Sequence, residues 1–426
     1  MKSNIILLLT ALSTIILASE SRSLTLDEAI VISKSRSLRM EGPRIDRDKV
    51  EGQISEAWSN ALPQADALAS YQRYLKTPIM GTDNVGYAEA TVTQPIYTFG
   101  RIGAGLRAAY STRAANGHLA SSTEKSLELD VMQGFWSVLL LRDVYAVRKE
   151  ALSLAESALD RVVKLRDVGL LSDYDVLRAR AQVSSLVAPM HQAENDLQLA
   201  DIALKNLLGV PLDTAFTVEG NLTQFDISVE DDLSNSTIAS RDDIEALRDV
   251  TRVYENGYAI YKNTGWPTIG AQAKYTWAWG SNNWTVDKNN RYSTVSAGIS
   301  MMIPLWSSGK NPGKAEQMKA DWRKSKLNLQ EAERGVRLQV IQSRNNYNTA
   351  VISEEAAAVA VAQAEEARKI AETRLENGQI TQFEIQSAQL DETAAKLSLV
   401  GAQYARLVAA AQLRNALGQS PYKKSN

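Results

Sequence analysis

Two hydroxyl–carboxylate pairs are the residues of this sequence best suited to chemistry. Ser172 precedes Asp175 by three residues, and Thr381 precedes Glu384 by three. A hydroxyl at a helix N-cap and a carboxylate three residues later form a capping box, in which each side chain bonds the other residue's backbone N–H. The same carboxylates could also line a narrow aqueous mouth and attract cations. Capping alone accounts for both pairs, so the charged mouth is a hypothesis beside it.

No other set of side chains predicts a catalytic, cofactor or metal site. The chain has no cysteine, which excludes disulfides, thiolate metal sites and cysteine nucleophiles. His118 and His191 have no second ligand near them in the sequence, and both are expected to be ordinary surface residues. A Gly-x-Gly-x-x-Ala run begins at Gly103, but a dinucleotide site needs a short crossover helix and a following strand, whereas a long helical pattern comes next. We therefore expect no enzyme, no cofactor and no metal.

The start of the chain is typical of an export signal. Lys2 is followed by an apolar run over residues 5–18 and then by small residues. That run is shorter than the ~20 residues that a membrane helix needs. Residues 1–23 are predicted to be a signal peptide, cleaved between Ala18 and Ser23. No later stretch reaches eighteen apolar residues, and the net charge of −2 gives no nucleic-acid footprint.

The remainder contains two copies of one unit. Pro95 and Pro304 are 209 residues apart, whereas Pro63 and Pro267 are 204 apart, so the second copy has five more residues between its prolines. The offset of 209 also relates Gly100 to Gly309, Gly169 to Gly378, Ser172 to Thr381, Tyr174 to Phe383, Asp175 to Glu384 and Gly209 to Gly418. A shared register over this length indicates a structural repeat. We expect repeat 1 over residues 24–212, a linker or equatorial segment over 213–240, repeat 2 over 241–421 and a short tail over 422–426.

Each copy is predicted to fold as helix, strand, strand, helix. Hairpins are expected at about 63–97 and 267–306, because apolar and polar residues alternate there with a period of two. Such segments of about ten residues, rich in Tyr and Trp, are typical of transmembrane barrel strands. A soluble sandwich is the alternative, although four strands in a largely helical chain make a poor one.

The alternation also assigns the faces of these strands. Ala273 and Ile299 lie on the apolar face and are expected to contact lipid. Glu89 and Lys274 lie on the polar face and are expected to face a water-filled lumen. Four tryptophans are expected to belong to an interfacial girdle or the barrel surface: Trp277, Trp279, Trp284 and Trp306.

Very long helices follow the hairpins. Residues 101–168 and 310–377 each give 68 residues of helical pattern, or about 100 Å. Gly169 and Gly378 are expected to end them as left-handed caps. A second helix then returns to Gly209 or Gly418, and Pro189 should kink the first of these. Six residues mark the transitions between barrel and helix: Pro63, Pro95, Gly100, Pro267, Pro304 and Gly309.

Four segments resemble the TolC family of outer-membrane channels. They are the opening helix at 25–29, the strand-to-helix crossing at 94–100, the helix–helix turn at 168–182 and the closing helix at 206–209. The resemblance covers nearly all of the predicted mature chain. It implies an all-α periplasmic tunnel continuous with a transmembrane β-barrel of twelve strands, built by a homotrimer in the Gram-negative outer membrane and in contact with its lipid.

The resemblance also implies partners and a gate. Such channels dock on a periplasmic adaptor (membrane fusion) protein and an inner-membrane pump of the RND or ABC type, and they pass drugs or proteins outward. The docking tips would be Gly169, Ser172, Gly378 and Thr381, and the periplasmic entrance would be formed by Asp175, Arg178, Glu384 and Ser387. In the family a second aspartate lies three residues after the acidic residue at the Glu384 position. Here Ser387 and Arg178 stand at those two places, so the full double acidic ring is absent.

Geometry supports association independently of the resemblance. Four strands cannot close a barrel around a lumen, because the smallest closed outer-membrane barrels have about eight. Association is therefore required, although the number three comes from the family. A surface-exposed structural coiled-coil protein and a periplasmic adaptor are the alternative functions, and neither explains tryptophan-rich hairpins at matched repeat positions. The cargo stays open among drugs, metals and secreted proteins.

Overall fold

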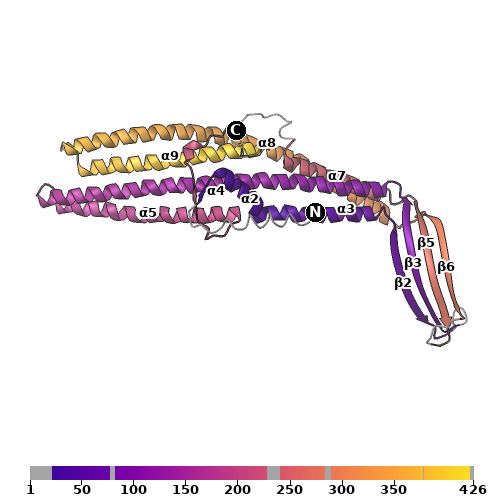
Figure 1. The fold of residues 1–426 in the computed structure, drawn as a ribbon. Helices are drawn as coiled ribbons and strands as arrows, with labels where there is room; N and C mark the ends of the chain where they lie inside the picture. Colours follow the sequence, from indigo (N-terminus) through magenta and orange to yellow (C-terminus); the bar gives the residue numbers. More distant parts are fainter. Residues whose placement is uncertain (1–21, 77–81, 228–239, 284–288, 378, 423–426) are drawn as a thin grey trace, which may run out of the picture. The chain divides into compact units, whose positions relative to one another are not determined.

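The computed structural model describes residues 22–76, 82–227, 240–283, 289–377 and 379–422 (Figure 1). Residues 1–21 of the predicted signal peptide, Trp284 and Gly378 lie outside the described residues. The chain divides into two compact units. The first unit combines Met1–Gly42, Ser121–Arg241 and Gly335–Asn426, and the second combines Pro43–Ala120 and Asp242–Arg334.

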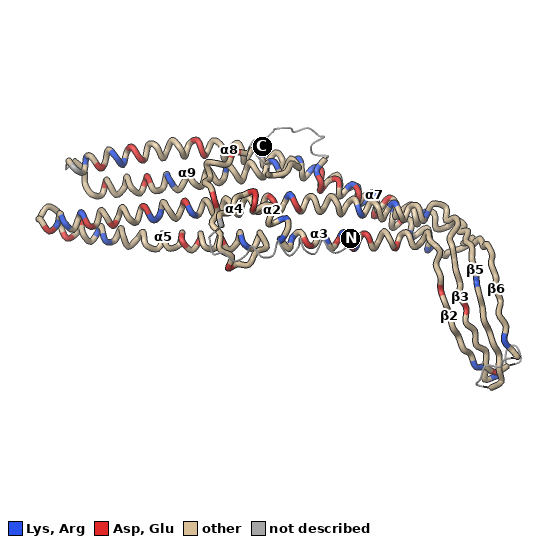
Figure 2. Tube along the Cα trace, viewed as in Figure 1, with Lys and Arg blue, Asp and Glu red and all other residues tan. Residues whose placement is uncertain are grey.

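The second unit contains one antiparallel sheet of four strands. In spatial order these are β2 (Gln64–Arg73), β3 (Asn84–Tyr97), β5 (Thr268–Ser281) and β6 (Arg291–Met302), which lie side by side in Figure 1. All four lie within the two predicted hairpins. Charged residues are sparse along these strands and frequent along the helices (Figure 2). The outermost strands of the sheet are β2 and β6.

The two hairpins share one pairing register. Gln64 lies opposite Thr93 in the β2–β3 hairpin, and Thr268 lies opposite Met302 in the β5–β6 hairpin. The first residues of these two pairs are 204 apart in the chain and the second residues are 209 apart. These are the offsets that the prolines of the sequence predict. The internal repeat therefore extends to the backbone pairing of the strands.

Each second strand passes into a long helix through a left-handed pair of residues. Phe99 and Gly100 have φ of 49° and 81°, and Ser308 and Gly309 have φ of 48° and 82°. Glycine accepts such angles without a steric cost. The helices α4 (Arg101–Asp167) and α8 (Lys310–Glu376) begin at the next residue. The six predicted transition residues thus lie where strands and helices meet or, for Pro95, at the shift in the β3–β5 register.

Aromatic and polar contacts fix the crossing in the first copy. The ring of Phe99 stacks on Trp266 at 5.3 Å between centroids and meets Tyr97 edge-on at 4.7 Å. Asn263 at the end of α7 (Asp242–Lys262) donates from Nδ2 to the Phe99 carbonyl at 3.0 Å. These contacts stabilise the positive φ of Phe99, a conformation that non-glycine residues seldom adopt.

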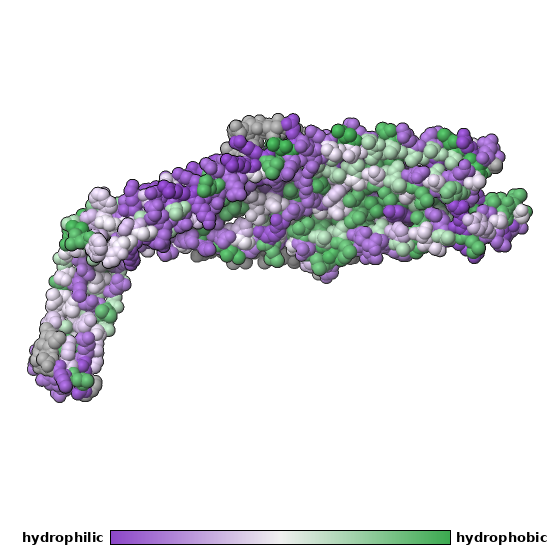
Figure 3. Space-filling model, turned by 180° about the vertical axis from the view of Figure 1, so that it is seen from behind, coloured by the Kyte–Doolittle hydropathy of each residue, from purple (hydrophilic) through white to green (hydrophobic). Residues whose placement is uncertain are grey.

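The first unit is built from antiparallel helices. The helix α4 is followed by α5 (Asp173–Leu208), and α8 is followed by α9 (Gln382–Ala416) (Figure 1). Its main core contains fully buried side chains from α4, α5 and α9: Leu127, Val131, Phe135, Trp136, Leu139, Leu204, Leu208, Leu407 and Ala411. Apolar side chains are also visible between these helices in the space-filling view (Figure 3). Closer to the turn, Val162 packs against Val176 and Ala179.

The first helical segment of repeat 1 is interrupted. It is two helices, α2 (Leu26–Arg36) and α3 (Leu38–Ser59), separated by Ser37 in an extended conformation. The physical reason is the end of α5, where Gly209 has φ 68° and a Cβ at that position would lie 2.4 Å from the Arg36 carbonyl oxygen. A continuous helix leaves no room for that close approach.

A small parallel sheet was also not expected. The strand β1 (Arg22–Leu24) pairs with β4 (Phe216–Val218) of the predicted linker. The predicted signal-peptide boundary at residue 23 therefore falls inside a strand. The helix α5 continues through Pro189 from Asp173 to Leu208, so that proline does not end it. Among the described residues, no helix combines the length and the apolarity needed to cross a membrane.

Candidate functional site

The turn between α4 and α5 has the predicted glycine cap. Gly169 has φ 78°, its N–H bonds the Arg166 carbonyl at 2.9 Å, and Leu170 N–H bonds the Leu165 carbonyl at 2.9 Å. This pattern satisfies carbonyls that a helix end leaves without partners. The turn between α8 and α9 has the equivalent bond, from Gln379 N–H to the Arg374 carbonyl at 2.8 Å. Gly378 itself is outside the described residues.

Both predicted capping boxes are confirmed. Ser172 Oγ accepts from Asp175 N–H at 3.4 Å, and Asp175 Oδ2 accepts from Ser172 N–H at 3.0 Å. Thr381 Oγ1 accepts from Glu384 N–H at 3.4 Å, and Glu384 Oε2 accepts from Thr381 N–H at 2.7 Å. Reciprocal bonds of this kind satisfy N–H groups that would otherwise lack partners at a helix start.

The capping bonds also set the charge of these carboxylates. Hydrogen bonds from the Ser172 hydroxyl and backbone, with a smaller contribution from Arg178, lower the pKa of Asp175. Bonds from the backbone and hydroxyl of Thr381, and then the charge of Arg374, lower the pKa of Glu384. A lowered folded pKa means that this stabilisation is present above the ordinary carboxyl pKa and is lost as the pH falls through the folded value. Both groups are therefore ionised at neutral pH.

A cation–π contact joins the two turns. The guanidinium of Arg178 in α5 lies 4.4 Å from the ring centroid of Phe383 in α9. A guanidinium over an aromatic face is attracted by the ring quadrupole. The structure thus brings Arg178 next to the residue preceding Glu384. Among the described residues, no hydrogen bond or ion pair joins Asp175 to Glu384, and Ser387 is exposed.

A buried charge cluster lies farther along α9. The carboxylate of Glu392, whose side chain is 6% exposed, pairs with Arg368 of α8 and, at 3.0 Å, with Lys396 of α9. Lys396 also pairs with Glu150 of α4 at 3.2 Å. Burial acts to lower the pKa of Lys396, but its bonds to Glu392 and Glu150 outweigh burial and raise it. The Glu392 carboxylate therefore holds two cations, one from α8 and one from α9, and Lys396 extends the cluster to α4.

Neither Phe383 nor the charge cluster was predicted from the sequence. A signal was present, because the repeat offset of 209 places Leu159, Val183 and Val187 at the positions equivalent to Arg368, Glu392 and Lys396. Charges in one copy at positions that are apolar in the other indicate a contact specific to that copy.

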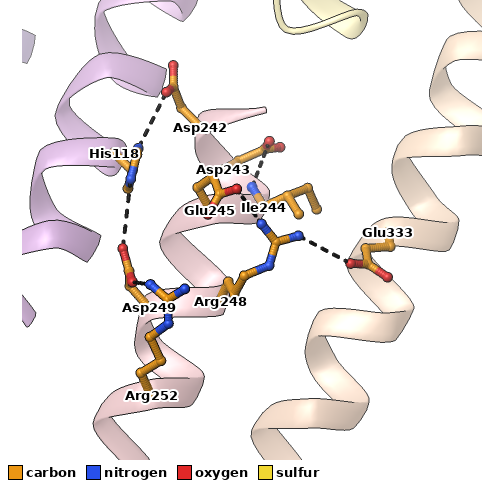
Figure 4. Close-up of polar contacts among 9 residues, drawn as sticks. All are labelled: His118, Asp242, Asp243, Ile244, Glu245, Arg248, Asp249, Arg252 and Glu333. Carbon is orange, nitrogen blue, oxygen red and sulfur yellow. Dashed lines mark hydrogen bonds and ion pairs between the residues drawn. The ribbon is translucent and has the colours of Figure 1, made fainter. Parts of the chain in front are cut away.

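His118, expected to be an ordinary surface residue, lies between two carboxylates. Its Nδ1 lies 3.5 Å from Asp242 Oδ1 and its Nε2 lies 3.8 Å from Asp249 Oδ2 (Figure 4). Asp249 is buried and also pairs with Arg252. Figure 4 shows this group within the second unit, next to the pair formed by Arg248 and Glu333 at 3.8 Å. Among the described residues, no group of His, Cys, Asp and Glu has the arrangement of a metal site.

Comparisons with known proteins identify what the chain resembles. The family model for outer membrane efflux proteins matches residues 30–210 and 233–419. Outer membrane protein TolC of Vibrio cholerae is 24% identical over 385 residues, which cover 87% of this chain and 85% of that protein. Outer membrane protein TolC of Escherichia coli is 24% identical over 400 residues, covering 88% and 78%.

Solved structures show the same fold. The Campylobacter jejuni CmeC outer membrane channel superposes with a TM-score of 0.81 at 16% identity, covering 94% of this chain and 87% of that one. The outer membrane protein VceC of Vibrio cholerae superposes with a TM-score of 0.79 at 19% identity, covering 93% and 97%.

The charge cluster predicts unequal effects of two matched substitutions. Glu392→Gln leaves Arg368 and Lys396 partly buried without their shared carboxylate, and we expect it to lower the free energy of unfolding by about 1–3 kcal/mol. Glu150→Gln removes the exposed end of the same cluster and should cost less than about 1 kcal/mol. Denaturant unfolding in detergent, followed by helical circular dichroism, measures both. Equal losses would show that the cluster does not depend on its buried member.

Proposed function

This chain belongs to the outer membrane efflux protein family, and we propose from that membership that three copies of it build one continuous exit duct. The chain is an outer-membrane protein that reaches into the periplasm and serves as the exit of a tripartite efflux pump. It conducts passively and is not an enzyme. The chemical energy for transport therefore comes from other components of the pump.

The partners follow from the same membership. Channels of this family work with an adaptor and an inner-membrane pump. For this chain we propose a periplasmic membrane fusion protein and a pump of the RND or ABC type, with outer-membrane lipid around the strands. Drugs or proteins would be the cargo.

The observation that best supports the trimer is the four-stranded sheet with two free edges. Both β2 and β6 have a partner strand on one side only among the described residues. Backbone groups in a bilayer must find hydrogen-bond partners within protein, so an open sheet edge does not occur in lipid. Three copies supply twelve strands, a number within the range of closed outer-membrane barrels.

The two faces of the sheet support the same assembly. On the polar face, Lys274 Nζ lies 2.5 Å from a carboxylate oxygen of Glu89 across the β3–β5 pair. On the other face, Tyr275, Val295 and Ile299 are exposed apolar side chains. A polar face lines the lumen and an apolar face meets lipid in such barrels.

The oligomer can be tested directly. Unheated outer-membrane fractions run in mild detergent should show a band at the size of three chains that collapses to one chain after boiling. Closed barrels with fully paired backbones resist detergent, whereas a periplasmic adaptor or a surface coiled-coil protein would not produce this heat-dependent band. A single-chain band without heating would contradict the trimer.

The strand faces predict a contrast between neighbouring positions of β6. Ile299→Arg should place a charge against lipid, at a cost of roughly 2–4 kcal/mol if it lies near the midplane. Ser296→Arg on the polar face should be tolerated, because its side chain would reach the lumen. The yield of heat-modifiable trimers measures both. Equal assembly of the two variants would show that the faces are assigned wrongly.

We also propose that the two helix turns form the periplasmic end. The docking tips would be Gly169, Ser172, Gly378 and Thr381, and the entrance would be lined by Asp175, Arg178, Glu384 and Ser387. Support comes from the ionised carboxylates of both capping boxes, of which Glu384 is exposed and Asp175 half-buried, and from the Arg178–Phe383 contact between the turns. Threefold symmetry would bring three copies of Glu384 together, where like charges attract cations.

Glu384→Gln separates the two roles of this carboxylate. Glutamine can replace glutamate in a capping box, so the start of α9 should keep its stability. The negative charge, however, is lost from every subunit. We expect weaker cation preference and less block by divalent cations in single-channel recordings from planar bilayers. Unchanged selectivity and block, with the trimer intact, would show that Glu384 serves only as a cap.

A further inference from the structure

The edge strands carry apolar side chains that have no use in a single chain. Met302 of β6 is 75% exposed, and Leu68 of β2 is 51% exposed. Leu68 and Met302 are unusual because they lie on the otherwise polar face of their strands. A surface of this kind indicates a protein contact.

The sheet already contains the template for that contact. The β3–β5 pair is the seam at which the second strand of repeat 1 meets the first strand of repeat 2, with Thr91 opposite Lys274 and Ala90 opposite Tyr275. The repeat places β6 at the position of β3, by an offset of 209, and β2 at the position of β5, by an offset of 204. Both offsets are obeyed by the observed registers of the two hairpins.

We infer that β6 of one subunit pairs antiparallel with β2 of the next in the register of the β3–β5 seam, with Ser300 opposite Ser70 and Ile299 opposite Tyr71. The inference rests on the proposed trimer and adds its register. Six consecutive pairs then fall within both strands, from Ala297 opposite Arg73 to Met302 opposite Leu68. Every polar-face residue meets a polar-face residue across the seam.

An independent feature of the sequence selects this register among those that keep the faces aligned. It places Met302 opposite Leu68, so that these two apolar side chains cover one another on the mainly polar face. A slip of two residues in one direction would place Met302 opposite Asp66, and a slip in the other direction would place it opposite Ser70. On the lipid face, Ile299 opposite Tyr71 is an aromatic–β-branched pair, a combination that stabilises antiparallel strands.

A contact at the end of the β3–β5 seam also has an equivalent at the proposed subunit seam. In the β3–β5 seam, Arg101 at the start of α4 donates from Nη2 to the hydroxyl of Thr268 at the start of β5. The equivalent residues are Lys310 at the start of α8 and Gln64 at the start of β2. A lysine ammonium and a glutamine side-chain oxygen preserve the cation-to-oxygen bond across the subunit boundary.

Cysteine pairs test the register, and the chain has no cysteine of its own to interfere. Ser70→Cys combined with Ser300→Cys in one chain changes only oxygen to sulfur at each position. Directly opposed antiparallel residues have Cα atoms about 4.5–5.5 Å apart, which a disulfide can span. After mild oxidation of trimers, we expect covalent dimers and trimers of the chain on a non-reducing denaturing gel, reversed by reductant.

Three matched pairs serve as controls. Thr91→Cys with Lys274→Cys is the repeat-equivalent pair inside one chain, so it should lose its free thiols without a change in chain size. Leu68→Cys or Gln72→Cys combined with Ser300→Cys are the two slipped registers. Their diagonal side chains are about 7–8 Å apart, so they should crosslink at least several-fold more slowly than the matched pair.

The outcomes separate this inference from the proposed function. Faster crosslinking of the Ser70–Ser300 pair than of either slipped pair supports the register. A slipped pair that crosslinks faster overturns it and leaves the trimer in place. Absence of any crosslink between subunits, with heat-modifiable trimers still present, overturns the β6–β2 seam itself. Absence of trimers from the unsubstituted protein would instead overturn the proposed function.

Discussion

The hydrogen-bonding demand of two sheet edges is the constraint on which this structure depends. Among the described residues, the backbones of β3 and β5 are paired on both sides, whereas β2 and β6 each have one open side. In lipid, an unsatisfied backbone group costs several kcal/mol, and an edge several residues long carries several such groups. The proposed association of three copies would meet this demand. Helices alone would not require hydrogen-bond partners from another chain. The four strands, rather than the helices, therefore decide whether this largely helical chain must associate.

The internal repeat explains how one chain meets that demand. Two hairpins in one register are related inside the chain as neighbouring subunits are related in the proposed ring. The seams differ in chemistry, however. The β3–β5 seam has the Glu89–Lys274 ion pair on its polar face, whereas the equivalent positions at the proposed subunit seam are Gly298 and Ser70. The helical part has diverged further, since the cluster around Glu392 has only apolar equivalents in repeat 1.

The sequence predicted the features that depend on local pattern. Alternation placed the four strands, the glycines marked the helix ends, and the spacing of Ser172 to Asp175 and of Thr381 to Glu384 predicted both capping boxes. Features that depend on tertiary contacts were missed. The break at Ser37 follows from the close approach of Gly209, the β1–β4 pair joins residues almost two hundred positions apart, and His118 meets its two aspartates only in the folded chain. None of these three tertiary contacts is marked by a periodic pattern in the sequence.

Capping and a charged entrance are compatible roles for the same carboxylates. In both boxes a single oxygen, Oδ2 of Asp175 or Oε2 of Glu384, accepts the capping bonds, and neither carboxylate makes another hydrogen bond among the described residues. Each carboxylate therefore caps its helix through one oxygen and has a second oxygen that takes no part in the cap. In the proposed trimer, three equivalent carboxylates would raise one another's pKa through repulsion, whereas the capping bonds lower it. A cap that holds each carboxylate ionised would thus offset the repulsion that otherwise favours protonation, so the helix start itself would help to keep the proposed entrance negatively charged.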